Sequence, residues 1–470
     1  MNPNRLPYEP PSIARNTTGL MNKVGRRGNL ASKTQVDGVE VEALIKDFGS
    51  PLFVFSETAI KRSVGEARTA IEMHLPQARL CWSYKTNYLG AICAIFHRAG
   101  SLAEVVSGME YEKARRLGVP GEEIVFNGPA KTEEELRRAL SEQAIIHADH
   151  FDELRLLERI AESTHTKPKI GIRVALDAGV VPRWDRFGFS LEAGSASQAA
   201  QFITQSPHLE LGGLHTHIGT YVQDPTAYAR AATKLAEFSG HIEATLATRP
   251  THLDFGGGFA STNTLATQYH SGTLVPRQGE YIREIGRALS QVNAARTPVF
   301  LETGRALVDE SGSLLTTVLA TKRLPNGRNS IVIDAGVNLL FTAWWYRLDI
   351  QPTRPSDGFI EDTTVYGPLC MNIDCVRETI ALPTLAAGDT LLIRPVGAYA
   401  FTQSMQFIHL RPACVLIGEH GEIELIRRRE ILDDLLGPEL LPNRLSLRSN
   451  PDSSITHRSS VRELAESVPD

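Results

Sequence analysis

One lysine stands behind a run of apolar and aromatic residues in the stretch LCWSYKTNYLG, residues 80–90. Residues 80–82 are typical of a buried strand, so Lys85 is expected where that strand ends. An isolated lysine at a strand end is usually a surface residue, because lysine is rarely buried without a partner. A lysine held on a rigid strand end can also form a Schiff base if desolvation or neighbouring cations lower its pKa.

Polar residues recur at the predicted ends of other strands in the same part of the chain. Each is weak evidence alone, since a single histidine or a GGG turn is usually structural. The segment DFGGGF offers backbone N–H groups to a phosphate, and ETGR places a carboxylate near a guanidinium. Together with a Schiff-base lysine, these groups predict a pyridoxal phosphate (PLP) site. The strand-end residues are Glu104, Ser107, Asn127, Arg173, His217, Asp254, Gly256, Gly257, Gly258, Glu302 and Arg305.

Strand-like and helix-like segments alternate along the first part of the chain. PLFVFS, ARLCWSYK, SLAEVVS and EIVFNG are each followed by a helix-like segment. This alternation predicts an α/β fold of βαβ units, and the number of units favours a closed, TIM-like (β/α)8 barrel. Reactive groups in such a barrel lie at the C-terminal ends of its strands.

The chain is expected to fall into four parts. A polar arm, expected to be flexible, covers residues 1–32, and the barrel that binds PLP covers residues 33–300, with its first residues able to join the next domain. Short strands separated by turns predict a β-rich C-terminal domain at 301–432. A polar tail covers residues 433–470.

Composition excludes several classes of function. Of the 470 residues, 42% are hydrophobic and 22% are charged, and the formal net charge of −5 argues against nucleic acid as a partner. The five cysteines lack CxxC spacing, so neither a metal site nor a disulfide framework is expected. No apolar run approaches the roughly 18 residues of a membrane span, and the N-terminus lacks the apolar core of a signal peptide. We therefore predict a cytoplasmic protein without a membrane partner.

Six motifs, in order, resemble the PLP-dependent decarboxylases of the alanine-racemase-like fold (fold type III), which include ornithine, arginine and diaminopimelate decarboxylases. SYKTN is similar to the family's Y-A-V-K-A-N, HTHIGT to H-x-H-I-G-S, and LDFGGGF to D-x-G-G-G-[FY]. ETGR is similar to E-P-G-R, YGPLC to G-P-x-C, and GAYAF to G-A-Y. The resemblance covers roughly residues 35–430, and its pattern is most similar to that of diaminopimelate decarboxylase.

The resemblance implies a role for each matching residue. Lys85 would bind PLP covalently, His217 would stack on its ring, and Glu302 would pair with the pyridine nitrogen. Cys370 would come from the partner subunit of a homodimer with shared active sites, and would protonate the substrate carbon after loss of CO2. The other PLP-binding residues would be Glu104, Arg173, Thr220 (in place of the family's serine), Gly256, Gly257, Gly258, Arg305 and Tyr399.

The sequence departs from the family where the distal group of the substrate would bind. Met371 stands where diamino-acid decarboxylases usually carry an acid for the distal amine. Thr342 falls where diaminopimelate decarboxylases usually carry an arginine for the distal carboxylate, and SMQFIHLRP replaces the usual S-N-Y. Diaminopimelate and ornithine therefore become poor substrate candidates. The residues expected to bind the small-molecule, amino-acid-type substrate are Thr342, Tyr346, Met371 and Asp374.

The leading hypothesis is a PLP-dependent decarboxylase of an amino acid or amino-acid derivative, with a modified or carrier-linked substrate as in siderophore or secondary-metabolite assembly. The main competing hypothesis is an amino-acid racemase of the same fold. Glu302 argues against it, because a carboxylate keeps the pyridine nitrogen protonated, whereas racemases of this fold place an arginine there. A non-catalytic PLP-family regulator and a phosphate-binding barrel without PLP also stay open.

Overall fold

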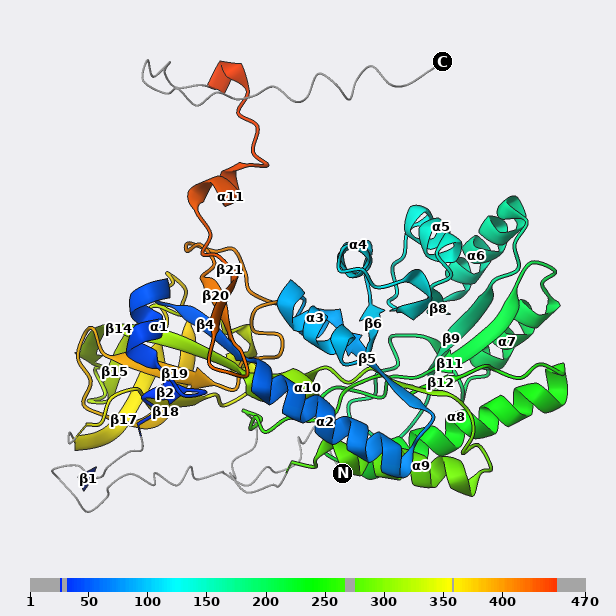
Figure 1. The fold of residues 1–470 in the computed structure, drawn as a ribbon, viewed down its shortest axis with the longest axis horizontal. Helices are drawn as coiled ribbons and strands as arrows, with labels where there is room; N and C mark the ends of the chain where they lie inside the picture. Colours follow the sequence, from blue (N-terminus) through cyan, green and yellow to red (C-terminus); the bar gives the residue numbers. More distant parts are fainter. Residues whose placement is uncertain (1–25, 28–31, 267–274, 357–358, 446–470) are drawn as a thin grey trace, which may run out of the picture. The chain divides into compact units, whose positions relative to one another are not determined.

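The computed structural model describes residues 26–27, 32–266, 275–356 and 359–445 (Figure 1). The chain divides into one compact unit that ends at Arg429 and a second unit that begins at Glu430. The described part of the second unit holds α11 (Leu432–Leu436) and the short helix η5 (Asn443–Leu445). Most of the predicted N-terminal arm and most of the predicted tail lie outside the described residues.

Eight parallel strands of the first unit form a closed barrel, which confirms the predicted fold. In ring order they are β5 (Ala78–Ser83), β6 (Leu102–Val105), β7 (Ile124–Phe126), β8 (Ile145–Ala148), β9 (Lys169–Ala175), β11 (Glu210–His215), β12 (Leu253–Asp254) and β13 (Val299–Leu301). β13 pairs with β5 and β8 pairs with β9, so the ring has no free edge. The short β10 (Phe189–Ser190) only extends the sheet beside β9.

α2 (Glu57–His74) precedes the first barrel strand and the other helices follow barrel strands, and the local sequence determines where several of them begin. The side chains of Ser56, Thr132 and Asp224 each accept a backbone N–H from the first turn of the helix that follows. Thr132 also takes part in a capping box. The helices are α2 (Glu57–His74), α3 (Gly90–Arg98), α4 (Gly108–Arg116), α5 (Glu133–Ser141), α6 (Phe151–Thr164), α7 (Ser195–Gln205), α8 (Pro225–Leu246), α9 (Gln278–Gln291) and α10 (Arg305–Val308).

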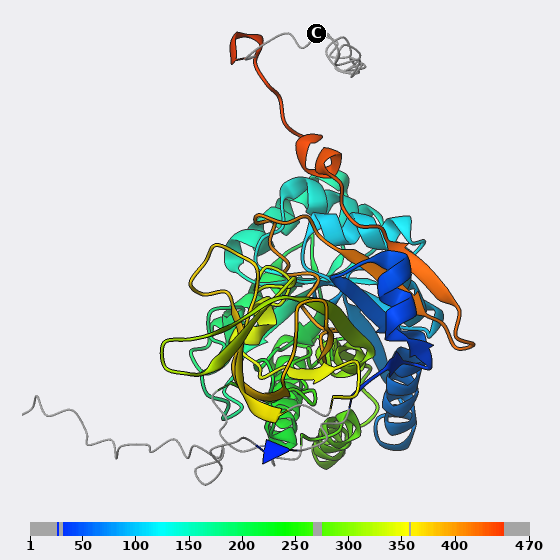
Figure 2. The same cartoon turned by 90° about the vertical axis from the view of Figure 1, so that its left-hand side faces the viewer.

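A second sheet joins strands from both ends of the first unit. β4 (Leu52–Ser56), which precedes the barrel, pairs antiparallel with β14 (Gly312–Arg323) and parallel with β20 (Ala413–Ile417) (Figure 2). The segment PLFVFS therefore lies in the β-rich sheet and not in the barrel, although its local pattern is that of a barrel strand. The other strands of this sheet are β1 (Arg26–Arg27), β15 (Asn329–Ile333), β16 (Asp349–Pro352), β17 (Phe359–Tyr366), β18 (Cys375–Pro383), β19 (Thr390–Arg394) and β21 (Ile423–Arg427).

A small hairpin and a helix precede β4 in the chain. The hairpin pairs β2 (Gln35–Val36) with β3 (Val39–Glu40), and α1 (Val41–Phe48) follows it. Val41 and Leu44 of this helix pack into a small apolar cluster together with Leu52 and Val54 of β4. The N-terminal elements are thus tied to the β-rich sheet by apolar packing.

Apolar packing makes the ends of the barrel strands rigid. β6 and β7 are buried along their whole length, and the indole of Trp82 stacks on Phe96 of α3 with 3.7 Å between ring centroids. Side chains in a close-packed interior of this kind have few alternative rotamers. Polar residues at the carboxyl ends of the strands therefore project from fixed points. Within the described ranges, no helix combines the length and the apolar composition needed to cross a lipid bilayer.

Candidate active site

Lys85 lies where the sequence predicts it, in the short helix η1 (Tyr84–Thr86) directly after β5. Its ammonium pairs with Glu104, and its side chain is 40% exposed, so a ligand can reach it. Desolvation would lower the pKa of Lys85, but the charges of Glu104 and Glu302 outweigh this effect and raise the pKa above its ordinary value. The condition set for a Schiff-base lysine, a lowered pKa, is therefore not met in this arrangement, because carboxylates rather than cations face the ammonium.

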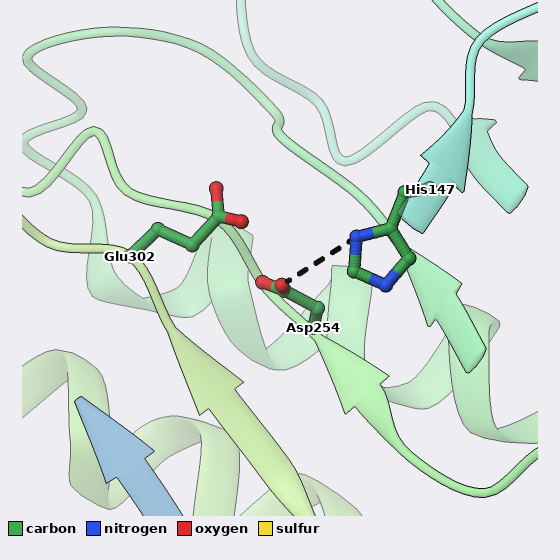
Figure 3. Close-up of side chains that lie close together, drawn as sticks. All are labelled: His147, Asp254 and Glu302. Atoms are coloured by element: carbon green, nitrogen blue, oxygen red, sulfur yellow. Dashed lines mark ion pairs between the residues drawn. The ribbon is translucent and has the colours of Figure 1, made fainter. Parts of the chain in front are cut away.

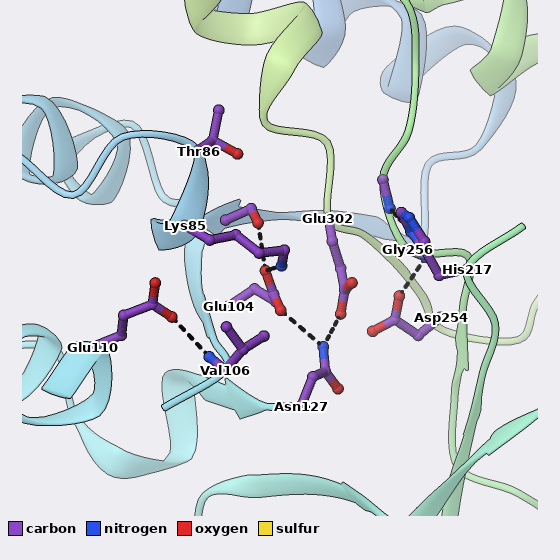
Figure 4. Close-up of polar contacts among 12 residues, drawn as sticks. Lys85, Thr86, Glu104, Val106, Glu110, Asn127, His217, Asp254, Gly256 and Glu302 are labelled. Atoms are coloured by element: carbon purple, nitrogen blue, oxygen red, sulfur yellow. Dashed lines mark hydrogen bonds and ion pairs between the residues drawn. The ribbon is translucent and has the colours of Figure 1, made fainter. Parts of the chain in front are cut away.

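The Asn127 amide links two buried carboxylates beside Lys85 (Figure 4). Its Nδ2 donates to Glu104 Oε1 at 3.2 Å and also to Glu302 Oε1. Glu104 is 1% exposed and Glu302 is 5% exposed. Buried carboxylates require such donors, because their charged forms lose hydration. The sequence marks Asn127 only as a strand-end residue, whereas the structure makes it the bridge between the two acids.

The pKa values of the neighbouring buried acids Asp254 and Glu302 shift in opposite directions. Asp254 ends β12, and its Oδ1 accepts the N–H of Gly256 at 2.8 Å. Burial, together with the charge of Glu302, raises the pKa of Asp254 well above its ordinary value. Burial also opposes the charge on Glu302, but the neighbouring His215 and Lys85 hold the pKa of Glu302 well below its ordinary value. Asp254 therefore keeps the proton and Glu302 is the anion.

Two histidines, separated by one residue, lie at and just after the end of β11 and have different surroundings. His215 is the last residue of β11, and its Nε2 lies 3.5 Å from Glu302 Oε2. His217 accepts the N–H of Gly257 at its Nδ1 over 3.2 Å, and the ring centroid of Trp184 lies 5.0 Å from its own. Burial, followed by the charges of nearby cations, holds the pKa of His217 well below its ordinary value. The His217 imidazole is therefore neutral.

The glycine turn after β12 has no room for side chains. A Cβ on Gly257 would lie 2.5 Å from the Glu302 carbonyl oxygen, and a Cβ on Gly258 would lie 2.1 Å from that of Gly219. Gly258 also has a φ of +96°, which L side chains rarely adopt. The N–H groups of Gly256 and Gly257 already have acceptors within the chain. Among the described residues, the Gly258 N–H is the member of the turn without an acceptor, so it is the one open to a phosphate.

Arg305 is a buried cation with an unfilled donor. It is 7% exposed, and its guanidinium carbon lies 4.8 Å from the ring centroids of both Tyr346 and Tyr399 and 5.9 Å from that of Tyr221. Asp309 Oδ2 is 3.9 Å from Nη1, and Nη1 has no hydrogen-bond partner in the described part of the chain. A buried donor of this kind calls for an acceptor. An anionic group such as a phosphate fits that requirement.

Two further residues from the predicted cofactor set lie elsewhere on the barrel. Arg173 belongs to β9, where its guanidinium carbon lies 4.5 Å from the Phe187 ring centroid and its Nη1 lies 3.7 Å from Asp149 Oδ1. Thr220 is exposed and follows Gly219. The structure places both at the ends of barrel strands or in the loops that follow, whereas their roles stay predictions.

The residues predicted to bind substrate come from the β-rich part of the chain. Cys370 is exposed and Met371 is half-buried, whereas Thr342 is 3% exposed and its Oγ1 has no partner among the described residues. Tyr346 packs against Arg305, which connects it to the cofactor end of the site. Asp374 uses both carboxylate oxygens to accept backbone N–H groups, from residues 337 and 369, so its visible role is to hold its own loop.

Comparison with known proteins identifies the family. A family model described as pyridoxal-dependent decarboxylase, pyridoxal binding domain, matches residues 60–309. The chain belongs to this family. The matched range begins in α2 and contains every barrel strand, with Lys85, the glycine turn and Glu302. PLP is therefore the cofactor of this decarboxylase, and the match favours a decarboxylase over a racemase.

Relatives of this decarboxylase extend over almost the whole described chain. The diaminopimelate decarboxylase of Aquifex aeolicus is 28% identical over 418 residues, which are 86% of this chain and 95% of that protein. That of Bacillus subtilis is 27% identical over 434 residues, 88% of this chain and 97% of that protein. The crystal structure of the Methanocaldococcus jannaschii diaminopimelate decarboxylase has a TM-score of 0.81 and 26% identity, covering 89% of this chain and 98% of that one.

The described residues fit the cofactor that the family implies. A reachable lysine, a buried guanidinium with an open donor, a glycine turn and a buried anion meet the requirements of an aldehyde, a phosphate and a protonated ring nitrogen. The sequence motifs identify most of these groups. Asn127, His147 and His252 are the contributors that they do not assign, since none of the three belongs to a motif.

Proposed function

We propose that this decarboxylase acts on an amino-acid derivative whose distal group is modified or carrier-linked, as in siderophore or secondary-metabolite assembly. The observation that carries the proposal is the neutral character of Thr342 and Met371, in contrast with the charged cofactor end. A diamino acid would present a charged distal group to these residues. Neither side chain can pair with an ammonium or a carboxylate, and burying such a charge unpaired is costly.

In the proposed site, this chain's own residues hold PLP at three points. Lys85 would bind it covalently, while Arg305, Tyr399, Thr220 and the N–H of Gly258 would hold the phosphate. The neutral His217 ring would stack on the cofactor ring, and Arg173 and Glu104 would lie beside it. When bound, PLP supplies the electron sink that makes loss of CO2 possible.

Glu302 has the charge that its proposed role requires. An anion opposite the protonated ring nitrogen would accept a charge-assisted hydrogen bond from its N–H group. The lowered pKa of Glu302 and the raised pKa of Asp254 support this assignment, because they favour a charged Glu302 beside a neutral Asp254. Asn127 holds one oxygen of Glu302, and His215 lies beside the other.

We propose that Glu104 accepts the proton that leaves the Lys85 ammonium. The Lys85 ammonium is hydrogen-bonded to Glu104 Oε2, so a proton that leaves Nζ has a bound acceptor. This contact resolves the conflict with the raised pKa of Lys85, because the amine becomes nucleophilic once Glu104 accepts its proton. The Ser83 hydroxyl donates to the same oxygen and keeps it in place.

We also propose that the working form is a homodimer in which Cys370 reaches the partner's barrel and donates a proton to the substrate carbon. Exposed apolar residues support this assembly, since large apolar side chains on one face mark protein interfaces. These residues belong to three segments that hydrogen bonds hold side by side. The N–H of Met405 donates to the Asn338 carbonyl oxygen, and Asp374 accepts the N–H of residue 337. The exposed apolar residues on these segments are Trp344, Trp345, Ile373, Met405, Phe407 and Ile408.

A CO2-release screen with the PLP-loaded enzyme tests the proposal. The panel pairs meso-diaminopimelate, L-lysine and L-ornithine with derivatives in which the distal group is an amide or an acyl conjugate. We expect a conjugated substrate to be preferred, with Lys85→Ala as the blank. Some relatives, including the diaminopimelate decarboxylase of Helicobacter pylori, were crystallised with L-lysine. A preference of this enzyme for meso-diaminopimelate would refute the altered specificity and leave the decarboxylase assignment intact.

A further inference from the structure

Two buried imidazoles fill the interior of the barrel below the carboxylates. His147 belongs to β8 and is 1% exposed, and His252 immediately precedes β12 and is 8% exposed. Glycines on neighbouring strands make room for them. A Cβ on Gly171 would lie 2.3 Å from His147 Cδ2, and a Cβ on Gly213 would lie 2.1 Å from His252 Nε2. The space for the two rings is therefore built into the backbone of β9 and β11.

These imidazoles connect to the active site through Asn127. His147 Nδ1 lies 2.8 Å from Asn127 Oδ1, and His147 Nε2 lies 2.8 Å from His252 Nε2. His252 Nδ1 lies 3.0 Å from the hydroxyl of Thr251. Figure 3 shows the His147 ring facing Asp254, with 4.0 Å between Nδ1 and Oδ2, and Glu302 beyond it.

The carboxylates determine the direction of every hydrogen bond in this chain. Asn127 must turn its Nδ2 towards Glu104 and Glu302, because its carbonyl oxygen would be repelled by both acids. The Oδ1 that faces His147 is then an acceptor, so His147 Nδ1 carries the hydrogen.

The direction of the Asn127–His147 hydrogen bond also determines the directions of the next two hydrogen bonds. A neutral His147 with a hydrogen on Nδ1 has a bare Nε2, so His252 must donate from its own Nε2. His252 Nδ1 is then bare, so the Thr251 hydroxyl donates to it at 3.0 Å rather than to the Gly212 carbonyl oxygen, which lies 3.2 Å from the same hydroxyl. Both rings remain neutral, because burial, followed by the charge of the neighbouring His215, lowers the pKa of His252 to about 4, and burial holds the pKa of His147 well below its ordinary value.

We propose that His147 and His252 are positioning residues for decarboxylation, and that their one-way hydrogen-bond chain holds the Asn127 amide against the Glu302 carboxylate so that this anion stays aimed at the cofactor ring. The inference rests on the proposed role of Glu302. Without the chain, the Asn127 carbonyl is a buried acceptor without a donor, and its amide can move away from Glu302. Thr251, at the far end, orients His252 from outside the barrel interior.

The test compares His252→Leu with His252→Gln in the PLP-loaded enzyme. Glutamine can place an N–H near the position of Nε2, whereas leucine fills a similar space without a donor. We expect His252→Leu to lower kcat about three- to tenfold, the equivalent of one neutral hydrogen bond, and His252→Gln to restore most of it. The bound PLP of the leucine variant should show a shifted absorption maximum that the glutamine variant reverses. His241→Leu, on the exposed face of α8, is the matched control and should change neither value.

A second measurement, which does not depend on activity, determines which ring nitrogens of His147 and His252 carry hydrogen. In 15N NMR of histidine-labelled holoenzyme, the signals of His147 should report a protonated Nδ1 and a bare Nε2, and those of His252 should report the opposite pattern. Assignment uses the single variants. Equal kcat and equal spectra for His252→Leu and His252→Gln, or a His147 protonated at Nε2, would overturn the proposal. If Glu302→Gln retained full turnover while both tautomers were as expected, the role of Glu302 would fail and the chain itself would stand.

Discussion

The two ends of the proposed active site differ in the charge that they bury. The cofactor end holds Glu104, Glu302 and Arg305 at 7% exposure or less. The two carboxylates accept hydrogen bonds from Asn127, and Arg305 has a donor that is open to an anion. The distal end is built around the neutral side chains of Thr342 and Met371. In our proposal the charged end performs the chemistry that is common to the family, while the neutral end selects the substrate. The difference would let reaction and specificity change independently, because the two ends come from different parts of the chain.

The largest effect is expected at the cofactor end, from Lys85→Ala. Loss of this amine removes the covalent attachment, so essentially all CO2 release should disappear. Borohydride reduction of the wild-type holoenzyme, followed by peptide mapping, should place the label on Lys85. Lys113→Ala is the control and should keep both label and turnover. A label on Lys113 or Lys131 would show that PLP is attached elsewhere and would contradict the assignment of the cofactor end.

The next effect concerns the distal end and free diamino acids. With meso-diaminopimelate and L-ornithine we expect kcat/KM below about 10⁴ M⁻¹s⁻¹, an ordinary value for a native substrate. An unmatched charge in a closed site can lower this ratio by up to about four orders of magnitude. The double variant Thr342→Arg, Met371→Glu should gain activity on meso-diaminopimelate, because it restores a partner for each distal charge. Efficient wild-type turnover of either compound would show that other residues recognise the distal group.

A smaller loss is expected from Glu302→Gln. Glutamine keeps the volume and the contact with Asn127 but removes the negative charge opposite the ring nitrogen. A charge-assisted hydrogen bond contributes about 1.5–3 kcal/mol, which corresponds to roughly ten- to a hundred-and-fifty-fold in kcat. PLP binding, measured by fluorescence titration, should persist. An unchanged kcat would mean that the buried charge of the cofactor end is dispensable.

The smallest signal comes from subunit complementation. Inactive Lys85→Ala and Cys370→Ala chains, mixed in equal amounts, should regain about a quarter of the wild-type activity if subunits exchange freely. The reason is that half of the random dimers hold one intact site out of two. Unmixed variants are the controls. If exchange is demonstrated and activity does not return, then both ends of the site come from the same chain.

Much of this site can be predicted from local sequence. The alternation of strands and helices is sufficient for the barrel, and the strand ends locate Lys85, the glycine turn and Glu302. The placement of β4 cannot be inferred in this way, because PLFVFS has the same local pattern as a barrel strand and its partners lie far along the chain. The raised pKa of Lys85 also depends on distant residues, since Glu302 reaches it only after the ring closes.

The pairing of His147 with His252 is the clearest case of information that is not local. These residues are 105 positions apart, and neither belongs to a motif. Their contact depends on Gly171 and Gly213 and on the register of four neighbouring strands. In the sequence each histidine is a single polar residue outside any motif, whereas in the structure Asn127 connects both to the Glu302 carboxylate.

The pairing of β4 with both β14 and β20 has a consequence for synthesis of the protein. A ribosome makes β4 first, then every strand of the barrel, then β14 soon after β13, and only much later β20. The barrel can close on the nascent chain once β13 has emerged, because its pairings need nothing beyond residue 301. β4 has two open edges until β14 is made and one open edge until β20 is made, and open edges are the surfaces on which strands of other chains add. The newborn enzyme therefore has a finished cofactor barrel before it has a finished sheet, and its exposure to aggregation ends only when β20 arrives.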